Sequence, residues 1–278
     1  MKRFPILGIL LLIPALMLTM TAGCNKEAPK KNGDDGKDGK KKHVEAKEIT
    51  TATDAVVKGV VKFKGADPEK PETRIAEHKE KDLCMAGKGK HILDQKWLVK
   101  DGLVENVVIS LEPPEGKKYK IDKKLKDSFE KKVATLDQPY CAYVPHIVAL
   151  YAGVQPLVVK NSATFLHNTK IDGGVKNGKT DAPVAPMGKL EPRTFVKDSN
   201  PIPVQCSLHN WMNAKIITFD HPYFAVTNEK GEFTIENVPI DEELVVYMWH
   251  ESMDNKKDVR KLTFKKGDNT IDGLELSK

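Results

Sequence analysis

Four residues of the kinds that bind metals lie in two short segments of this chain. Cys206, His209 and Met212 recur every third residue in Cys-Ser-Leu-His-Asn-Trp-Met, and His167 lies earlier in Phe-Leu-His-Asn. A short loop can direct three ligands at one ion only if a distant strand supplies the fourth. The spacing therefore predicts a single metal site that His167 completes.

The donor types favour copper at this site. Two imidazoles and a thiolate in a plane, with a weak axial thioether, are the ligands of type 1 (blue) copper centres that transfer electrons. Thiolate and thioether are soft donors that favour Cu(I), whereas imidazole accepts either oxidation state, so a rigid mixed set lets the metal cycle with little rearrangement. Zinc is an alternative, but its usual ligands are thiolate, imidazole and carboxylate, so Met212 discriminates against it. A third alternative is a buried cluster without metal, since Met commonly fills cores.

The C-x2-H-x2-M loop resembles that of the cupredoxin family, and it looks like the short loop of amicyanin more than the longer one of plastocyanin. Asn168 follows the first His and Ser207 follows the Cys, as in the family. The resemblance implies a Greek-key β-sandwich or barrel, one type 1 copper, and a link between the two ligand loops through the Asn168 and Ser207 side chains. It also implies that His209 lies near the surface as the port for electrons.

The start of the chain predicts export. Lys2 and Arg3 precede an apolar stretch over residues 4–20, and small residues lead to Cys24. The ending resembles a bacterial lipobox, in which Cys24 would become the lipidated first residue of the mature protein. Ordinary cleavage and an uncleaved anchor are the alternatives. We expect residues 1–24 to be a signal peptide and the protein to be periplasmic or in the cell envelope, tethered to a membrane through Cys24.

Residues 25–54 predict a disordered charged linker, because they combine dense charge of both signs with no apolar periodicity. The formal net charge of the whole chain is +6. This modest excess suits docking to acidic redox proteins but does not argue for nucleic acid, since no basic stripe interleaved with aromatic residues occurs.

Two further cysteines, Cys84 and Cys141, remain once Cys24 is assigned to lipid and Cys206 to metal. In an oxidising compartment the simplest interpretation is a disulfide between them. The alternative is a second metal site that includes His146, which the spacing from Cys141 permits.

The body of the chain predicts an all-β fold. Valine-rich alternating runs separated by turn residues are typical of sandwiches. These runs cover residues 55–63, 105–111, 146–151, 155–159, 215–219, 231–235 and 244–249. The lysine-rich residues 117–132 predict either a loop or a short exposed helix.

The length of the body exceeds one small cupredoxin domain, so a second unit is needed. Residues 55–115 and 221–278 resemble the two halves of a carboxypeptidase regulatory-like (transthyretin-like) β-sandwich. We therefore expect a cupredoxin domain over 116–220 to be inserted into a sandwich formed by both flanks. The rival is a cupredoxin with plain N- and C-terminal extensions.

The remaining residues do not point to catalysis. The chain lacks nucleophile-elbow, phosphate-loop and zinc-hydrolase motifs, and none of its eight histidines form the His-x-His pairs of multicopper oxidases. We expect His221 to make a turn contact, and His250 either to pack at the contact between the two domains or to support a metal ligand. The prediction is an electron carrier and not an enzyme. The alternatives are a copper carrier or chaperone, and a β-sandwich binding module with an auxiliary metal site.

Overall fold

The computed structural model describes residues 45–68, 75, 78–86, 95–253 and 257–278. The predicted signal peptide, Cys24 and residues 25–44 of the predicted linker lie outside these residues. The described part is built mainly of β-strands in several sheets, which confirms the predicted all-β class. Within it, no helix has the length and apolar character that crossing a bilayer requires.

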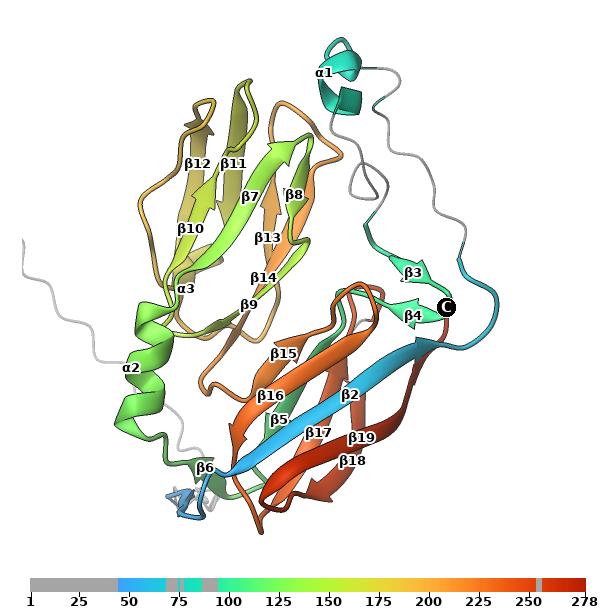
Figure 1. Cartoon of the computed structure of the whole chain (residues 1–278). Helices are drawn as coiled ribbons and strands as arrows, with labels where there is room; N and C mark the ends of the chain where they lie inside the picture. Colours follow the sequence, from blue (N-terminus) through green and yellow to red (C-terminus); the bar gives the residue numbers. More distant parts are fainter. Residues whose placement is uncertain (1–44, 69–74, 76–77, 87–94, 254–256) are drawn as a thin grey trace, which may run out of the picture. The chain divides into compact units, whose positions relative to one another are not determined.

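The first sandwich takes strands from both flanks of the chain (Figure 1). One sheet has the order β16-β2-β4-β3, with β19 pairing with β2, and the other has the order β15-β5-β17-β18. Their bounds are β2 (Ala55–Phe63), β3 (Val99–Lys100), β4 (Leu103–Val104), β5 (Val108–Glu112), β15 (Phe224–Val226), β16 (Glu232–Val238), β17 (Glu243–Trp249), β18 (Lys257–Thr263) and β19 (Gly267–Leu276).

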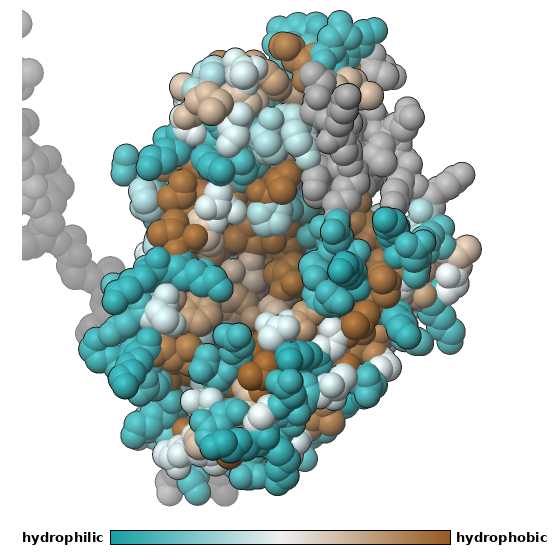
Figure 2. Space-filling view, viewed as in Figure 1, coloured by the Kyte–Doolittle hydropathy of each residue, from teal (hydrophilic) through white to brown (hydrophobic). Residues whose placement is uncertain are grey.

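Strict alternation along β2 explains how this sandwich forms its core. Ala55, Val57 and Val61 are buried on one face, because successive side chains of a strand point to opposite sides. Gly59 continues this buried face, where a Cβ atom would lie 2.6 Å from the Phe233 ring. Only glycine lets the strands approach this closely. Hydrophilic residues cover much of the face seen in Figure 2, with apolar residues showing between them.

The second sandwich is formed by the middle of the chain (Figure 1). One sheet has the order β10-β7-β8 and the other β12-β11-β13-β14-β9. The elements are β7 (Ala134–Tyr140), β8 (Ala142–Val144), β9 (Ile147–Tyr151), β10 (Leu157–Lys160), β11 (His167–Asp172), α3 (Gly174–Asn177), β12 (Lys179–Val184), β13 (Ile202–Gln205) and β14 (Asn213–Phe219).

Short elements connect and flank the two sandwiches. β1 (Lys47–Ile49) pairs in parallel with β6 (Lys117–Tyr119). The prediction of disorder up to residue 54 is therefore wrong for β1, because Ile49 is buried in the first core. Helix α2 (Lys123–Lys131) starts where the Asp122 carboxylate accepts a hydrogen bond from the Lys124 N–H at 2.7 Å, so the lysine-rich stretch contains a helix.

The two sandwiches share a small apolar cluster of their own. Val108 and Trp249 come from β5 and β17 of the first sandwich, and Ile147, Ile217 and Phe219 come from β9 and β14 of the second. These side chains are buried together, so this cluster is the apolar contact between the two sandwiches.

Candidate metal centre

The fold brings the four predicted ligands to one end of the second sandwich. His167 is the first residue of β11, Cys206 follows β13, and Met212 precedes β14, which pairs with β13. The Cys206 Sγ lies 3.8 Å from the His209 Nδ1, and ligand atoms of these two residues and His167 lie within 4.8 Å of one another. The strands thus place a thiol and two imidazoles within reach of one ion.

Backbone hydrogen bonds set the shape of the ligand loop. The Met212 N–H donates to the His209 carbonyl at 2.9 Å, and the Cys206 N–H donates to the Met212 carbonyl at 3.2 Å. The loop is therefore closed on itself before any metal binds. The Met212 side chain is buried in the same apolar cluster as Cys206.

The donor atoms fit a bound metal. Cys206 is a free thiol, and both ring nitrogens of His167 are buried without a hydrogen bond of normal geometry. The Tyr140 carbonyl lies on the side of one of these nitrogens, where it raises the His167 pKa slightly. A buried polar atom without a partner costs free energy, and a metal ion bound to the other nitrogen would remove that cost.

The electrostatics keep both imidazoles neutral. Burial, together with the nearby His209, lowers the His167 pKa to about 4. Burial also lowers the His209 pKa, although Glu80 opposes the effect. A neutral imidazole offers a lone pair, which a metal ligand must have, so both side chains are ready to bind at neutral pH.

Asn168 connects the two ligand loops. Its Oδ1 accepts a hydrogen bond from the Ser207 backbone N–H at 3.3 Å, and its Nδ2 donates to the Asp181 carboxylate at 2.9 Å. The predicted link therefore uses the Ser207 backbone and not its side chain, since the Asn168 amide reaches the main chain of the loop directly. The hydrogen bond between Asn168 and Ser207 holds the segment that contains His167 against the loop that contains Cys206.

Tyr143 is a supporting residue that the sequence reasoning missed. Its buried hydroxyl lies 3.0 Å from the Asn168 carbonyl and 3.0 Å from the Gln205 carbonyl. These carbonyls belong to the neighbours of His167 and Cys206, so the tyrosine ties both ligand strands together. Burial raises its pKa, which keeps the hydroxyl protonated. No local sequence signal distinguishes this tyrosine from an ordinary core residue.

The expectation that His209 lies near the surface is wrong. His209 is fully buried, at 0% exposure, and its Nε2 lies 2.9 Å from the Glu80 Oε2. The cover comes from residues 78–86, which include helix α1 (Lys81–Ala86) and belong to the connection between β2 and β3. A segment from the first half of the chain thus lies over the ligand loop.

Cys84 and Cys141 form a disulfide with a Cα to Cα distance of 5.0 Å. The bond attaches α1 to the turn between β7 and β8. His146 is not part of this cluster, because its Nε2 lies 2.7 Å from the Glu251 Oε1 and its Nδ1 lies 3.0 Å from the Asn213 carbonyl.

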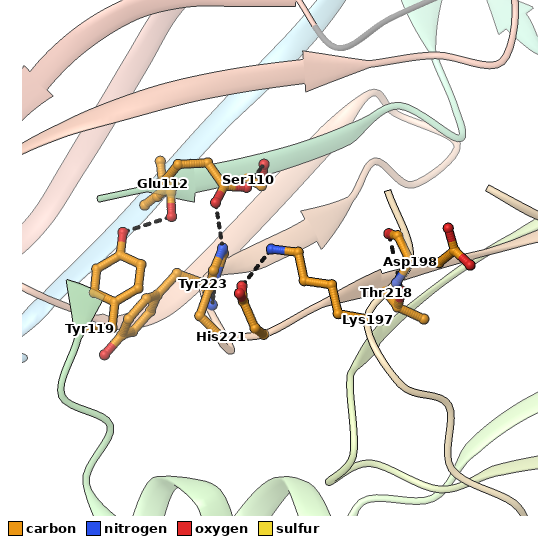
Figure 3. Close-up of polar contacts among 10 residues, drawn as sticks. Ser110, Glu112, Tyr119, Lys197, Asp198, Thr218, His221 and Tyr223 are labelled. Atoms are coloured by element: carbon orange, nitrogen blue, oxygen red, sulfur yellow. Dashed lines mark hydrogen bonds and ion pairs between the residues drawn. The ribbon is translucent and has the colours of Figure 1, made fainter. Parts of the chain in front are cut away.

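The two remaining predicted histidines lie in structural contacts. The His221 Nε2 lies 3.1 Å from the Glu112 carboxylate, beside Tyr119 and Tyr223, as Figure 3 shows. His221 also accepts the Tyr223 N–H at 3.2 Å, the turn contact expected of it. The buried His250 ring packs against the Trp97 ring with centroids 4.1 Å apart and planes tilted by 32°, as expected for a packing residue.

Comparison with known proteins gives no match to a family model or to a curated protein. Among solved structures, a Cu(I) form of an amicyanin variant is similar over 31% of this chain and 82% of its own, with 15% identity and a TM-score of 0.28. A purple cupredoxin from Nitrosopumilus maritimus is similar over 31% of this chain and 99% of its own, with 14% identity and a TM-score of 0.26. A copper-containing nitrite reductase from Thermus scotoductus is similar over 32% of this chain but 23% of its own, with 13% identity and a TM-score of 0.29.

Proposed function

We propose that this chain is an exported type 1 copper protein of the cupredoxin kind that transfers single electrons between redox protein partners. In this proposal the cupredoxin domain covers residues 116–220, and residues 55–115 with 221–278 form a transthyretin-like sandwich that carries it. The observation that carries the proposal is the buried convergence of His167, Cys206 and His209, with one imidazole whose ring nitrogens lack normal hydrogen bonds.

Each ligand has a distinct task. His167 and His209 would hold the ion through their imidazoles, Cys206 through its thiolate, and Met212 would supply a weak thioether ligand. Bound copper would supply one-electron chemistry between Cu(II) and Cu(I). The chain contributes rigidity, because the loop hydrogen bonds and the Asn168 link exist without the metal. A preformed site needs little movement when its charge changes, and this suits rapid electron exchange.

Burial favours an electron carrier over a copper chaperone. The four ligands are 0% (His167), 2% (Cys206), 0% (His209) and 1% (Met212) exposed. A chaperone must present its metal to another protein, which an enclosed set of four ligands hinders. An electron needs no such opening, since it can pass through the covering side chains.

The same enclosure supports a carrier over an enzyme. Four protein ligands leave no coordination position for a substrate, unlike catalytic metal sites, which keep one position open. Export, a lipid anchor on Cys24 and a location in the periplasm or cell envelope complete the proposal. Partition into membranes by the wild type, and its loss in Cys24→Ala, would test the anchor.

The central test is the visible spectrum of the purified protein after addition of Cu(II) and then ascorbate. We expect an intense blue colour from charge transfer between the Cys206 thiolate and Cu(II), and ascorbate should bleach it. Cys206→Ser should abolish the colour and leave the far-ultraviolet circular dichroism unchanged. Cys24→Ser, which replaces a different cysteine, should stay blue. A blue Cys206→Ser variant would contradict the assignment, and a wild type that binds metal without colour would favour zinc.

A further inference from the structure

The segment that covers the metal centre brings a carboxylate onto one of the ligands. Residues 78–80 and helix α1 lie over the ligand loop, and the Cys84–Cys141 disulfide fastens α1 to the second sandwich. Glu80 lies at the point of contact, with its Oε2 2.9 Å from the His209 Nε2. His209 therefore has chemical partners at both of its ring nitrogens.

The two nitrogens of His209 have different surroundings. Nδ1 lies 3.8 Å from the Cys206 thiol, on the side of the proposed metal, whereas Nε2 meets Glu80. An ionised carboxylate only accepts hydrogen bonds, so the Nε2 atom must carry the proton. A neutral ring with a proton on Nε2 has its lone pair on Nδ1, the nitrogen that points toward the thiol.

Neighbouring groups hold Glu80 in this position. Its backbone N–H donates to the His78 Nδ1 at 3.2 Å, and the His78 ring lies 5.2 Å from the His209 ring and 5.0 Å from the Trp211 ring. Trp211 in turn donates its indole N–H to the Cys141 carbonyl at 3.1 Å. These contacts and the disulfide thus hold the short segment that carries Glu80.

We propose that Glu80 is a positioning residue of the metal centre, which accepts a hydrogen bond from the His209 Nε2–H, directs Nδ1 at the metal and biases the centre toward its oxidised state. The inference rests on the proposed function. A carboxylate bonded to a ligand imidazole fixes the ring and raises its basicity. The negative charge also favours Cu(II) over Cu(I), because the oxidised centre carries one more positive charge. The Nε2 proton stays in place while one electron enters from an external donor.

The test compares Glu80→Gln with the wild type in a redox titration against soluble one-electron mediators. Glutamine keeps the size and an acceptor oxygen but removes the charge. We expect the equilibrium ratio of oxidised to reduced protein at a fixed potential to fall about tenfold, which corresponds to a reduction potential raised by about 59 mV. Glu80→Asp, which keeps the charge, should shift the potential by less.

Glu112→Gln is the matched control. Glu112 also meets a buried histidine, with the His221 Nε2 at 3.1 Å, but this pair lies in the first sandwich (Figure 3). Loss of its charge should leave the potential unchanged. An equal shift in both variants would mean that any loss of a buried carboxylate acts in the same way, and it would overturn the proposal.

A second measurement does not need copper. Nitrogen-15 chemical shifts of His209 in the metal-free wild type should report the tautomer with the proton on Nε2. A proton on Nδ1 would overturn the proposal even if Glu80→Gln failed to fold. A wild type that never turns blue would refute the proposed function, whereas a blue Glu80→Gln with the wild-type potential would refute only the role of Glu80.

Discussion

Removal of the Cys84–Cys141 disulfide should cost this protein a large part of its stability. The two cysteines are 57 residues apart and both are fully buried in the second core. A cross-link restricts the unfolded chain, and the loss of loop-closure entropy grows with the logarithm of the loop length. For a loop of this length the chain-entropy relation predicts about 4 kcal/mol at 25 °C.

The assay is urea unfolding of the wild type and of the Cys84→Ala, Cys141→Ala double variant, followed by circular dichroism. With a slope of about 2 to 3 kcal/mol/M, a loss of this size lowers the urea midpoint by about 1.3 to 2 M. A thiol reductant should lower the wild-type midpoint toward that of the variant and leave the variant unaffected. This control separates the cross-link from the loss of two buried sulfur atoms.

A loss below about 1 kcal/mol would refute the reasoning, because it would show that the unfolded chain already holds the two cysteines close together. A shallower transition would instead indicate that the variant no longer unfolds in a single two-state step. Either result would be visible in the same titration.

Two further predictions concern the first sandwich and its contact with the second. Gly59→Ala should destabilise the protein by about 1 to 3 kcal/mol, because the new Cβ would lie 2.6 Å from the Phe233 ring and 2.8 Å from the Ile271 carbonyl oxygen; an unchanged melting temperature would contradict this. Burial is the main cause that lowers the His250 pKa to about 4. As the pH falls, the unfolded chain therefore protonates His250 before the folded protein does. The free energy of unfolding should fall by about 3 kcal/mol between pH 6.5 and pH 4. His250→Phe, which can still pack against Trp97, should remove that part of the pH dependence, as measured by unfolding across this range.

The ligand set and the β class were predictable because both depend on local order in the chain. The three-residue spacing of Cys206, His209 and Met212 needs only a turn between two strands, and alternating valines produce the strands themselves. The identity of a metal follows from donor chemistry, which residue types carry with them. The disulfide between Cys84 and Cys141 was also predictable from the sequence, because only these two cysteines remained after Cys24 and Cys206 were assigned.

The surroundings of the site depended on tertiary structure. Glu80 and His209 are 129 residues apart, and no sequence pattern connects them. The same holds for His146 and Glu251, which are 105 residues apart, and for Tyr143 and the Gln205 carbonyl, which are 62 apart. Long-range partners are set by how sheets pack and by where a connection crosses the surface. Residue types and spacing therefore determined which atoms can bind the metal, whereas packing decided that His209 is buried and which group its outer nitrogen meets.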